Sequence, residues 1–263
     1  MSFILRIALV LISFIYLANA QKVEILTASK KGNYYSLIKN KKCANGLELM
    51  PVVTLGSVEN IKLLISKKTY QHALIQSDIV ETFNLFTNNE YKNIITVNKI
   101  LDNYMEVVYV IKLKSNTKIE ELSTKFFNKL SLKDKKDFKA INIGKYGTGN
   151  NIVGYKIISD LNLGMSLAYE DNDDALIHLI NKKISLLIYV AKYDTKTQKH
   201  SKWIENILQD YGEYLELISL KTNGYYNKVV KLKNIDTVQI NTSFISTSKD
   251  INLTKKIFQC INE

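Results

Sequence analysis

Arginine, proline, cysteine and histidine are all scarce in this 263-residue chain. The scarcity of arginine and of histidine restricts most strongly how the chain could bind an anion or a metal. Arg6 is the only arginine, so no bidentate guanidinium fork is available to hold an anion after it. A bound anion would have to be held by helix N-termini, hydroxyls, amides or lysine. The histidines His72, His178 and His200 lack a recognisable nucleophile or metal partner, and no Cys/His spacing matches a zinc site. We therefore expect no metal and no cofactor.

The two cysteines, Cys43 and Cys260, are far apart in the sequence. In an oxidising compartment such an even pair can form a disulfide. Two unpaired small hydrophobic side chains fit the sequence equally well. The sequence leaves both alternatives open.

Residues 1–20 have the pattern of a secretory signal peptide. Arg6 is followed by an apolar stretch over residues 7–17 and then by Ala18-Asn19-Ala20. The apolar stretch is shorter than the ~20 residues of a membrane span, although a retained signal anchor is the alternative. We predict cleavage after Ala20, a periplasmic mature chain from Gln21, and no lipoprotein anchor, because no cysteine follows the cut. No other stretch is long and apolar enough to cross a membrane.

The chain is basic, with a formal net charge of +11. A surplus of this size can indicate nucleic acid or an anionic surface. Here the lysines are scattered over polar segments, and no RNA-binding signature or aromatic-basic stripe accompanies them. We interpret them as solvated surface and expect no nucleic-acid partner.

Short apolar runs typical of strands alternate along the chain with segments of helical periodicity. We expect strands at residues 23–28, 47–54, 72–75, 104–111, 140–143, 166–169, 184–191, 214–220 and 237–240. Helices are expected at about 33–42, from 58, from 77 or 78, at 119–128, near 131–137, over 153–161, at 173–181, at 201–210 and from about 253. The alternation predicts an α/β protein with open, largely parallel sheets and helices on both faces. Ligands of such sheets bind beyond the carboxyl ends of the strands.

Four strand-to-helix turns carry glycine or neutral polar side chains. They are Lys31-Gly32-Asn33-Tyr34-Tyr35, Gly56-Ser57-Val58-Glu59-Asn60, Gln76-Ser77-Asp78 and Gly144-Lys145-Tyr146-Gly147-Thr148-Gly149-Asn150. Glycine lets the backbone approach a ligand, and the helix behind it offers free N–H groups. Each turn alone fits an ordinary helix cap, and the glycines match neither the dinucleotide fingerprint nor a P-loop. Four such turns in one chain favour a ligand site.

These motifs, in this order, make the chain resemble the TAXI family of solute receptors that serve tripartite ATP-independent (TRAP) transporters. The resemblance rests on residues 32–35, on Gly56 to Asn60 with Leu63-Leu64, on residues 73–78, on Gly147-Thr148-Gly149, and on Tyr225-Tyr226 followed by Asp236-Thr237. It covers nearly the whole mature chain. The chain departs from the family pattern before Tyr34, where a second small residue is missing, and at residues 192–195, where glycine-proline is expected.

The resemblance implies a two-lobed type II periplasmic-binding fold, each lobe an open mixed sheet flanked by helices. Lobe one would comprise residues 22–109 plus 221–263 and lobe two residues 110–220, with crossings near Val110 and Leu220. Family members bind amino-acid-like or dicarboxylate-like solutes, which implies a small organic anion in the interlobe cleft and a TRAP-type permease as partner. We expect a monomer and no enzymatic activity.

The predicted contacts place the anionic end of the solute against the helix starts at Asn33-Tyr34 and Ser57-Val58, with Thr148 and Gly149 closing from lobe two. The full set of predicted ligand-binding residues is Asn33, Tyr34, Tyr35, Gly56, Ser57, Val58, Asn60, Gln76, Ser77, Thr148, Gly149, Asn150 and Tyr189.

Three other functions stay open. The same fold could serve a sensor system as its ligand-binding input, or a receptor could have become a scaffold without a ligand. A periplasmic enzyme is the third, although the sequence holds no nucleophile elbow, metal cluster or paired carboxylates with a stated role. Asp171, Asp173 and Asp174 do cluster, and we predict that they cap the helix that follows.

Overall fold

The structure is a computed structural model that describes residues 21–66, 69–86, 96–99, 105–116, 119–222, 224, 226 and 228–263. The predicted signal peptide, residues 1–20, lies outside the described residues, as does Tyr225. Among the residues that are described, no helix is both long and apolar enough to span a membrane.

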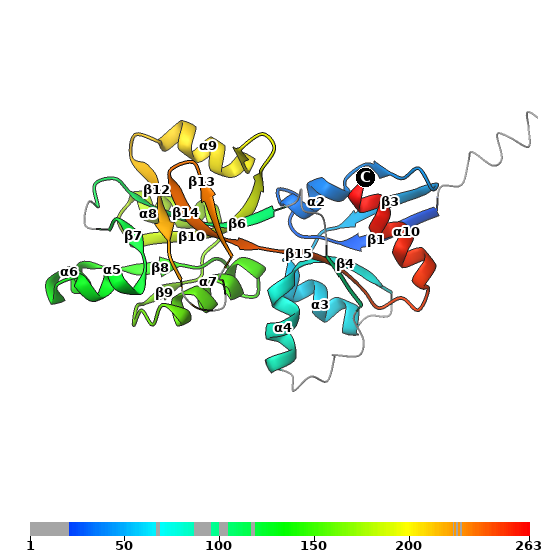
Figure 1. Cartoon of the computed structure of the whole chain (residues 1–263), viewed down its shortest axis with the longest axis horizontal. Helices are drawn as coiled ribbons and strands as arrows, with labels where there is room; N and C mark the ends of the chain where they lie inside the picture. Colours follow the sequence, from blue (N-terminus) through cyan, green and yellow to red (C-terminus); the bar gives the residue numbers. More distant parts are fainter. Residues whose placement is uncertain are drawn as a thin grey trace, which may run out of the picture.

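The chain forms two lobes that lie side by side, each built on one sheet (Figure 1). We call lobe one the six-stranded sheet and its helices. Its strands, in spatial order, are β2 (Lys41–Lys42), β3 (Leu47–Val52), β1 (Gln21–Leu26), β4 (His72–Gln76), β15 (Thr242–Ser246) and β5 (Thr96–Lys99). Strands β3, β1 and β4 are parallel, whereas β2, β15 and β5 pair antiparallel with their neighbours.

Helices cover both faces of this sheet, because its central strands are apolar on both sides. On one face α2 (Asn33–Ile38) and α10 (Ile251–Asn262) pack against residues such as Ile25, Leu49 and Phe244. On the other face α3 (Ser57–Ser66) and α4 (Ser77–Phe86) pack against Leu26, Ile75 and Ile245. The carboxyl ends of β1 and β4 thereby lead directly toward helix starts.

A disulfide joins Cys43, which follows β2, to Cys260 in α10, with 5.3 Å between their Cα atoms. Both cysteines are buried in the same core of lobe one. The alternative of two unpaired thiols is therefore not realised, and the bridge stays within one lobe.

Lobe two is the nine-stranded sheet and its helices. Its strands run in the order β13 (Val229–Leu232), β14 (Ile235–Ile240), β6 (Met105–Leu113), β10 (Ile184–Asp194), β8 (Ala140–Asn142) and β9 (Leu167–Ala168), with β7 (Glu121–Leu122), β11 (Lys199–His200) and β12 (Leu215–Leu220) attached beside this path. Helices α5 (Thr124–Lys129) and α7 (Gly149–Asp160) pack on one face, and α8 (Asn172–Ile180) and α9 (Lys202–Tyr211) on the other. Helix α6 (Leu132–Asp137) follows α5.

The chain crosses between the sheets at other places than the sequence suggests. Val110 lies in the middle of β6, and β13 and β14 follow Leu220 but belong to the second sheet. The crossings therefore lie between β5 and β6 and at Asn241, between β14 and β15. Figure 1 shows the second of these, where the chain passes from β14 in one lobe to β15 in the other. The division into folding units stays a prediction.

Most predicted elements are present, with three corrections. The first helix ends at Ile38 instead of residue 42, because Asn40 has a φ of 60° and the chain turns into β2. The helix expected over 119–128 is β7 followed by α5, which Ser123 caps through its side chain. The sheets are mixed and not largely parallel, since β6 and β15 each pair antiparallel with their neighbours.

Candidate functional site

A cavity of about 130 Å³ lies between the two lobes. Residues from lobe one and from lobe two, including strand β6 of lobe two, contribute to its wall. Its lining residues are Ala28, Gly32, Asn33, Tyr34, Leu55, Gly56, Ser57, Gln76, Glu106, Thr148, Gly149, Asn150, Tyr189 and Val190. A volume of this size is below the ~300–1,000 Å³ of pockets for drug-sized ligands. The cavity therefore suits a small solute.

The turn before α3 brings backbone to the cavity from lobe one. Gly56 has a φ of 118°, a conformation that side chains with a Cβ rarely adopt. Ser57, the first residue of α3, is buried, and its hydroxyl oxygen accepts a hydrogen bond of 3.1 Å from the Gln76 backbone N–H. Its O–H proton is then available for a second partner, so Ser57 can donate to an anion at the N-terminus of a ten-residue helix.

The start of α7 faces this turn from lobe two. Thr148 caps α7 by accepting from the Asn151 N–H at 3.2 Å, while its own hydroxyl donates to the Lys145 carbonyl at 2.7 Å. The next residue, Gly149, lies against lobe one: a Cβ at Gly149 would be 2.8 Å from Gln76 Cδ and would also collide with Gln76 Oε1. The N-termini of α3 and α7 thus meet at one cavity, and a side chain at Gly149 would either displace the Gln76 amide or hold the lobes apart.

Gln76 ends β4 with its side chain at the cavity, and it is 5% exposed. Its backbone N–H is bonded to Ser57, but its side-chain oxygen Oε1 is buried and has no hydrogen-bond partner among the described residues. A buried amide oxygen without a donor costs about 1–3 kcal/mol. A solute that donates a hydrogen bond would remove this cost.

Glu106 is the one charged side chain among the described residues that line the cavity. It is 4% exposed, and its Oε2 accepts hydrogen bonds from Tyr34 Oη at 2.8 Å and Thr242 Oγ1 at 3.1 Å. Burial raises the pKa of Glu106 to about 7, the two hydroxyl donors lower it, and the negative charge of Asp78 raises it further. A carboxyl in this state can accept from a cation or, when protonated, donate.

Tyr189 lines the cavity on the lobe-two side and belongs to an aromatic pair. Tyr189 of β10 packs on Trp203 of α9 with 4.6 Å between ring centroids. Trp203 Nε1 donates to Asp173 Oδ1 at 3.1 Å, and Asp173 Oδ2 lies 3.4 Å from the ammonium of Lys31 in lobe one. Burial raises the pKa of Tyr189 to about 12, with the charge of Glu106 adding to the effect, so its phenol stays protonated.

The lobes touch at further points around the cavity. Asp78 in α4 of lobe one accepts a hydrogen bond from Tyr226, which packs in a core of lobe two. Together with the Gly149–Gln76 and Lys31–Asp173 contacts, this bond shows that the lobes are closed over the cavity.

Nine of the thirteen predicted ligand-binding residues line this cavity: Asn33, Tyr34, Gly56, Ser57, Gln76, Thr148, Gly149, Asn150 and Tyr189. Their contact with a solute stays a prediction. The other four, Tyr35, Val58, Asn60 and Ser77, lie outside its lining.

In three of the predicted residues, the polar side-chain groups form hydrogen bonds that hold the fold together. Asn60 is fully buried, and its amide bonds the carbonyls of Thr27 and Leu74 at 2.6 and 2.8 Å, which ties α3 to β1 and β4. Ser77 Oγ bonds the Asn241 carbonyl at 2.9 Å, at the crossing into β15. Asn150 accepts from the Val190 N–H at 2.7 Å and so fixes the glycine loop to β10, although it also lines the cavity.

The predicted set of ligand-binding residues missed Glu106, together with Ala28, Gly32, Leu55 and Val190. The signal for Glu106 was present: it is the only acid in a nine-residue strand that is otherwise almost entirely buried and apolar. A lone acid in such a strand is rarely buried without a partner.

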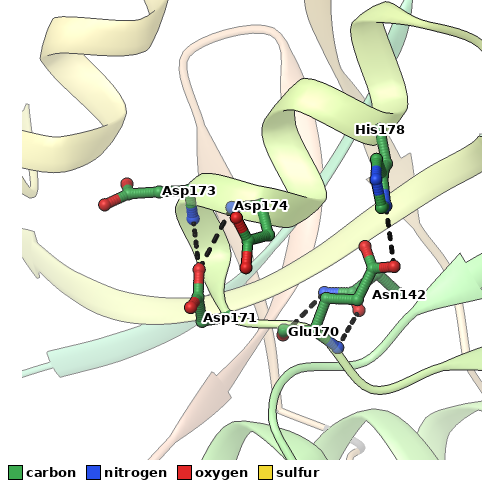
Figure 2. Close-up of polar contacts among 6 residues, drawn as sticks. All are labelled: Asn142, Glu170, Asp171, Asp173, Asp174 and His178. Carbon is green, nitrogen blue, oxygen red and sulfur yellow. Dashed lines mark hydrogen bonds and ion pairs between the residues drawn. The ribbon is translucent and has the colours of Figure 1, made fainter.

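The acidic cluster after β9 is a helix cap, as predicted (Figure 2). Asp171 Oδ1 accepts from the backbone N–H groups of Asp173 and Asp174, both at 3.1 Å. Beside it, Glu170 Oε1 lies 2.7 Å from His178 Nδ1, and Asn142 accepts from the Glu170 backbone. Within the described part of the chain, no group of three or more His, Cys, Asp or Glu side chains could hold a metal ion.

Known proteins agree with this architecture. A family model described as the NMT1-like family matches residues 25–196. The chain belongs to the NMT1-like family. No curated protein matches this NMT1-like sequence.

The NMT1-like chain is also similar to solved two-lobed binding proteins, at identities that show the fold alone. One is the amino acid ABC transporter substrate-binding protein AbpA of Streptococcus pneumoniae, bound to L-arginine (10% identity, 91% of this chain and 87% of that one, TM-score 0.53). Another is holo ArgBP of T. maritima (12% identity, 91% and 88%, TM-score 0.52). A third is the effector-binding domain of QuiR with shikimate (10% identity, 93% and 96%, TM-score 0.55). The NMT1-like protein has the fold of type II periplasmic binding proteins.

Proposed function

We propose that this protein is an exported solute receptor that captures a small carboxylate-bearing molecule between its lobes. The observation that carries the proposal is the cavity itself, where the N-termini of α3 and α7 meet from opposite lobes. Unpaired N–H groups and the helix dipoles favour an anion there. Neither lysine nor arginine is among its described lining residues, so these backbone groups and the Ser57 hydroxyl are what would hold a carboxylate.

Closure of the lobes is the basis of the binding mechanism. A solute stabilises the closed form only through contacts made in both lobes. Ser57 and Gln76 on one side, and Gly149 on the other, line the cavity and would supply such contacts. The buried, preformed cavity contains no arrangement of a nucleophile with a base among its described lining residues, which favours binding over catalysis.

The transport role rests on the sequence. The signal-peptide pattern of residues 1–20 supports export to the periplasm, and the TAXI-like motifs support a TRAP-type permease as the partner. The likeness to the effector domain of QuiR makes a sensor input the second candidate. Genes for a TRAP permease beside this gene would favour transport, and a regulator or sensor kinase there would favour sensing.

A thermal-shift and calorimetric screen of the purified protein tests the proposal. The panel is amino acids, mono- and dicarboxylates and small sulfonates. A bound solute raises the melting temperature with its concentration. Ser57→Ala should weaken binding of the best compound by about 1–3 kcal/mol, because a buried anion loses a donor. A flat response over the whole panel, with folded protein, would contradict the proposed function.

A further inference from the structure

We infer that the solute also carries an ammonium group and that Glu106 is the residue that selects it. This inference rests on the proposed function, because it assigns the second pole of a molecule whose carboxylate lies at the helix N-termini. The ligand class is then a small amino acid or another compact amino carboxylate, rather than a hydroxy, oxo or dicarboxylic acid.

The first support is the position and bonding of the Glu106 carboxyl. Both of its hydrogen bonds, from Tyr34 Oη and Thr242 Oγ1, end on Oε2. Among the described residues no group donates to Oε1, while Glu106 lines the cavity. One carboxylate oxygen is thus fixed by the protein, which leaves the other for a solute.

The second support is the charge balance around Glu106. Burying a carboxylate is costly unless it is paired with a cation. The groups that face Glu106 are the phenol of Tyr34 on α2, Asp78 on α4 and the phenol of Tyr189 on β10, and the charge of Asp78 opposes ionisation. Lys192 is opposite Glu106 in the β6–β10 register but does not line the cavity. A ligand ammonium would supply the cation that the described cavity wall lacks.

The third support is a second acceptor in the same cavity. Gln76 Oε1 is buried without a hydrogen-bond partner among the described residues. An ammonium has three N–H donors, and a hydroxyl has one while a carbonyl has none. An ammonium that donates to Glu106 Oε1 would therefore have N–H groups left for a further acceptor such as Gln76 Oε1, which neither alternative would have.

The test is a calorimetric comparison of matched molecules that differ only at this position. The two triplets are L-alanine, L-lactate and pyruvate, and L-glutamate, 2-hydroxyglutarate and 2-oxoglutarate. In the best-fitting triplet the amino acid should bind at least about tenfold more tightly than the hydroxy and oxo acids. Glu106→Gln should weaken the amino acid by about tenfold or more and leave the other two within about threefold. Glutamine keeps an acceptor for Tyr34 and Thr242, so the variant should fold.

A control and a second readout separate the alternatives. Glu24→Gln, an exposed acid on β1, should not change binding. Titrations of wild type near pH 7 in buffers of different ionisation enthalpy should show net proton release with the amino acid, because the ammonium favours ionised Glu106. If the hydroxy or oxo acid binds as tightly as the amino acid, or Glu106→Gln leaves the preference unchanged, the inference is wrong while the proposed function stands. If no member of either triplet and no other carboxylate binds, both are wrong.

Discussion

Replacement of Gly149 by alanine should separate ligand affinity from fold stability. Gly149 is the first residue of α7, and its φ is not in the left-handed region, so alanine is compatible with the backbone. Alanine is also favoured over glycine in a helix by up to about 1 kcal/mol. The unliganded protein should therefore be no less stable than wild type.

In the closed form the buried amide of Gln76 occupies the space that the added methyl group would need. A Cβ at this position would be 2.8 Å from Gln76 Cδ and 3.1 Å from Ser57 Oγ, and it would overlap Gln76 Oε1. Overpacking of this kind costs about 1–3 kcal/mol. Since the clash arises between the lobes, opening relieves it, and the cost is subtracted from ligand binding. We expect an affinity about 5- to 150-fold lower.

Trp203 provides the assay for Gly149→Ala, because it is the only tryptophan and packs on Tyr189 at the cavity. Its fluorescence is titrated with the tightest carboxylate of the panel, and the melting temperature is measured without solute. Gly164→Ala is the matched control, since a Cβ at Gly164 meets nothing within 4 Å. Affinity within twofold of wild type in Gly149→Ala would refute the view that Gly149 and Gln76 are in contact in the liganded form.

Three further predictions concern stability. Replacing Cys43 and Cys260 by serine should lower the free energy of unfolding by about 2–4 kcal/mol in urea titrations, and equal midpoints would contradict this. Burial raises the pKa of Glu106 to about 7 from 4.5, so its contribution to the free energy of unfolding is full below pH 4.5 and is lost as the pH rises through 7. The difference in free energy of unfolding between wild type and Glu106→Gln should therefore change by up to about 3 kcal/mol over this pH range. Burial lowers the pKa of His72 to about 4 from 6.5, so its contribution to the free energy of unfolding is full above pH 6.5 and is lost as the pH falls through 4. If the free energy of unfolding of a His72→Asn variant falls with acidification as steeply as that of wild type, this prediction is wrong.

The helices and strands with a regular apolar pattern could be predicted from the sequence, and β15 could not. Helix α3 and strand β4 follow their periodicity closely. Strand β15 is short and rich in hydroxyls, which reads as a loop, yet all five of its residues are buried. Its hydroxyls bond partners that are distant in the sequence, such as His72 for Ser246 and Glu106 for Thr242. No local pattern contains those partners.

The site could be predicted as a set of turns but not as a set of side-chain roles. Ser57 and Asn60 belong to the same motif, but Ser57 lines the cavity whereas the Asn60 amide bonds two backbone carbonyls. An asparagine amide can bond a solute or a backbone carbonyl equally well. Which of the two the Asn60 side chain bonds depends on the position of strands elsewhere in the chain. Glu106 was missed for a related reason: its place at the cavity depends on where the chain crosses between the lobes.

The position of β15 has a consequence for how the molecule is completed. This strand lies between β4 and β5, although it is made after the whole of lobe two. Until β15 has been made, one edge of β4 is unpaired and β5 has no neighbour in the described sheet. The sheet of lobe one therefore cannot be completed before the C-terminal part of the chain has been made. Lobe two, which is continuous from β6 to β14, is free to form first. Because Cys260 lies in α10, which follows β15, the disulfide with Cys43 can form only after the chain has been made through α10.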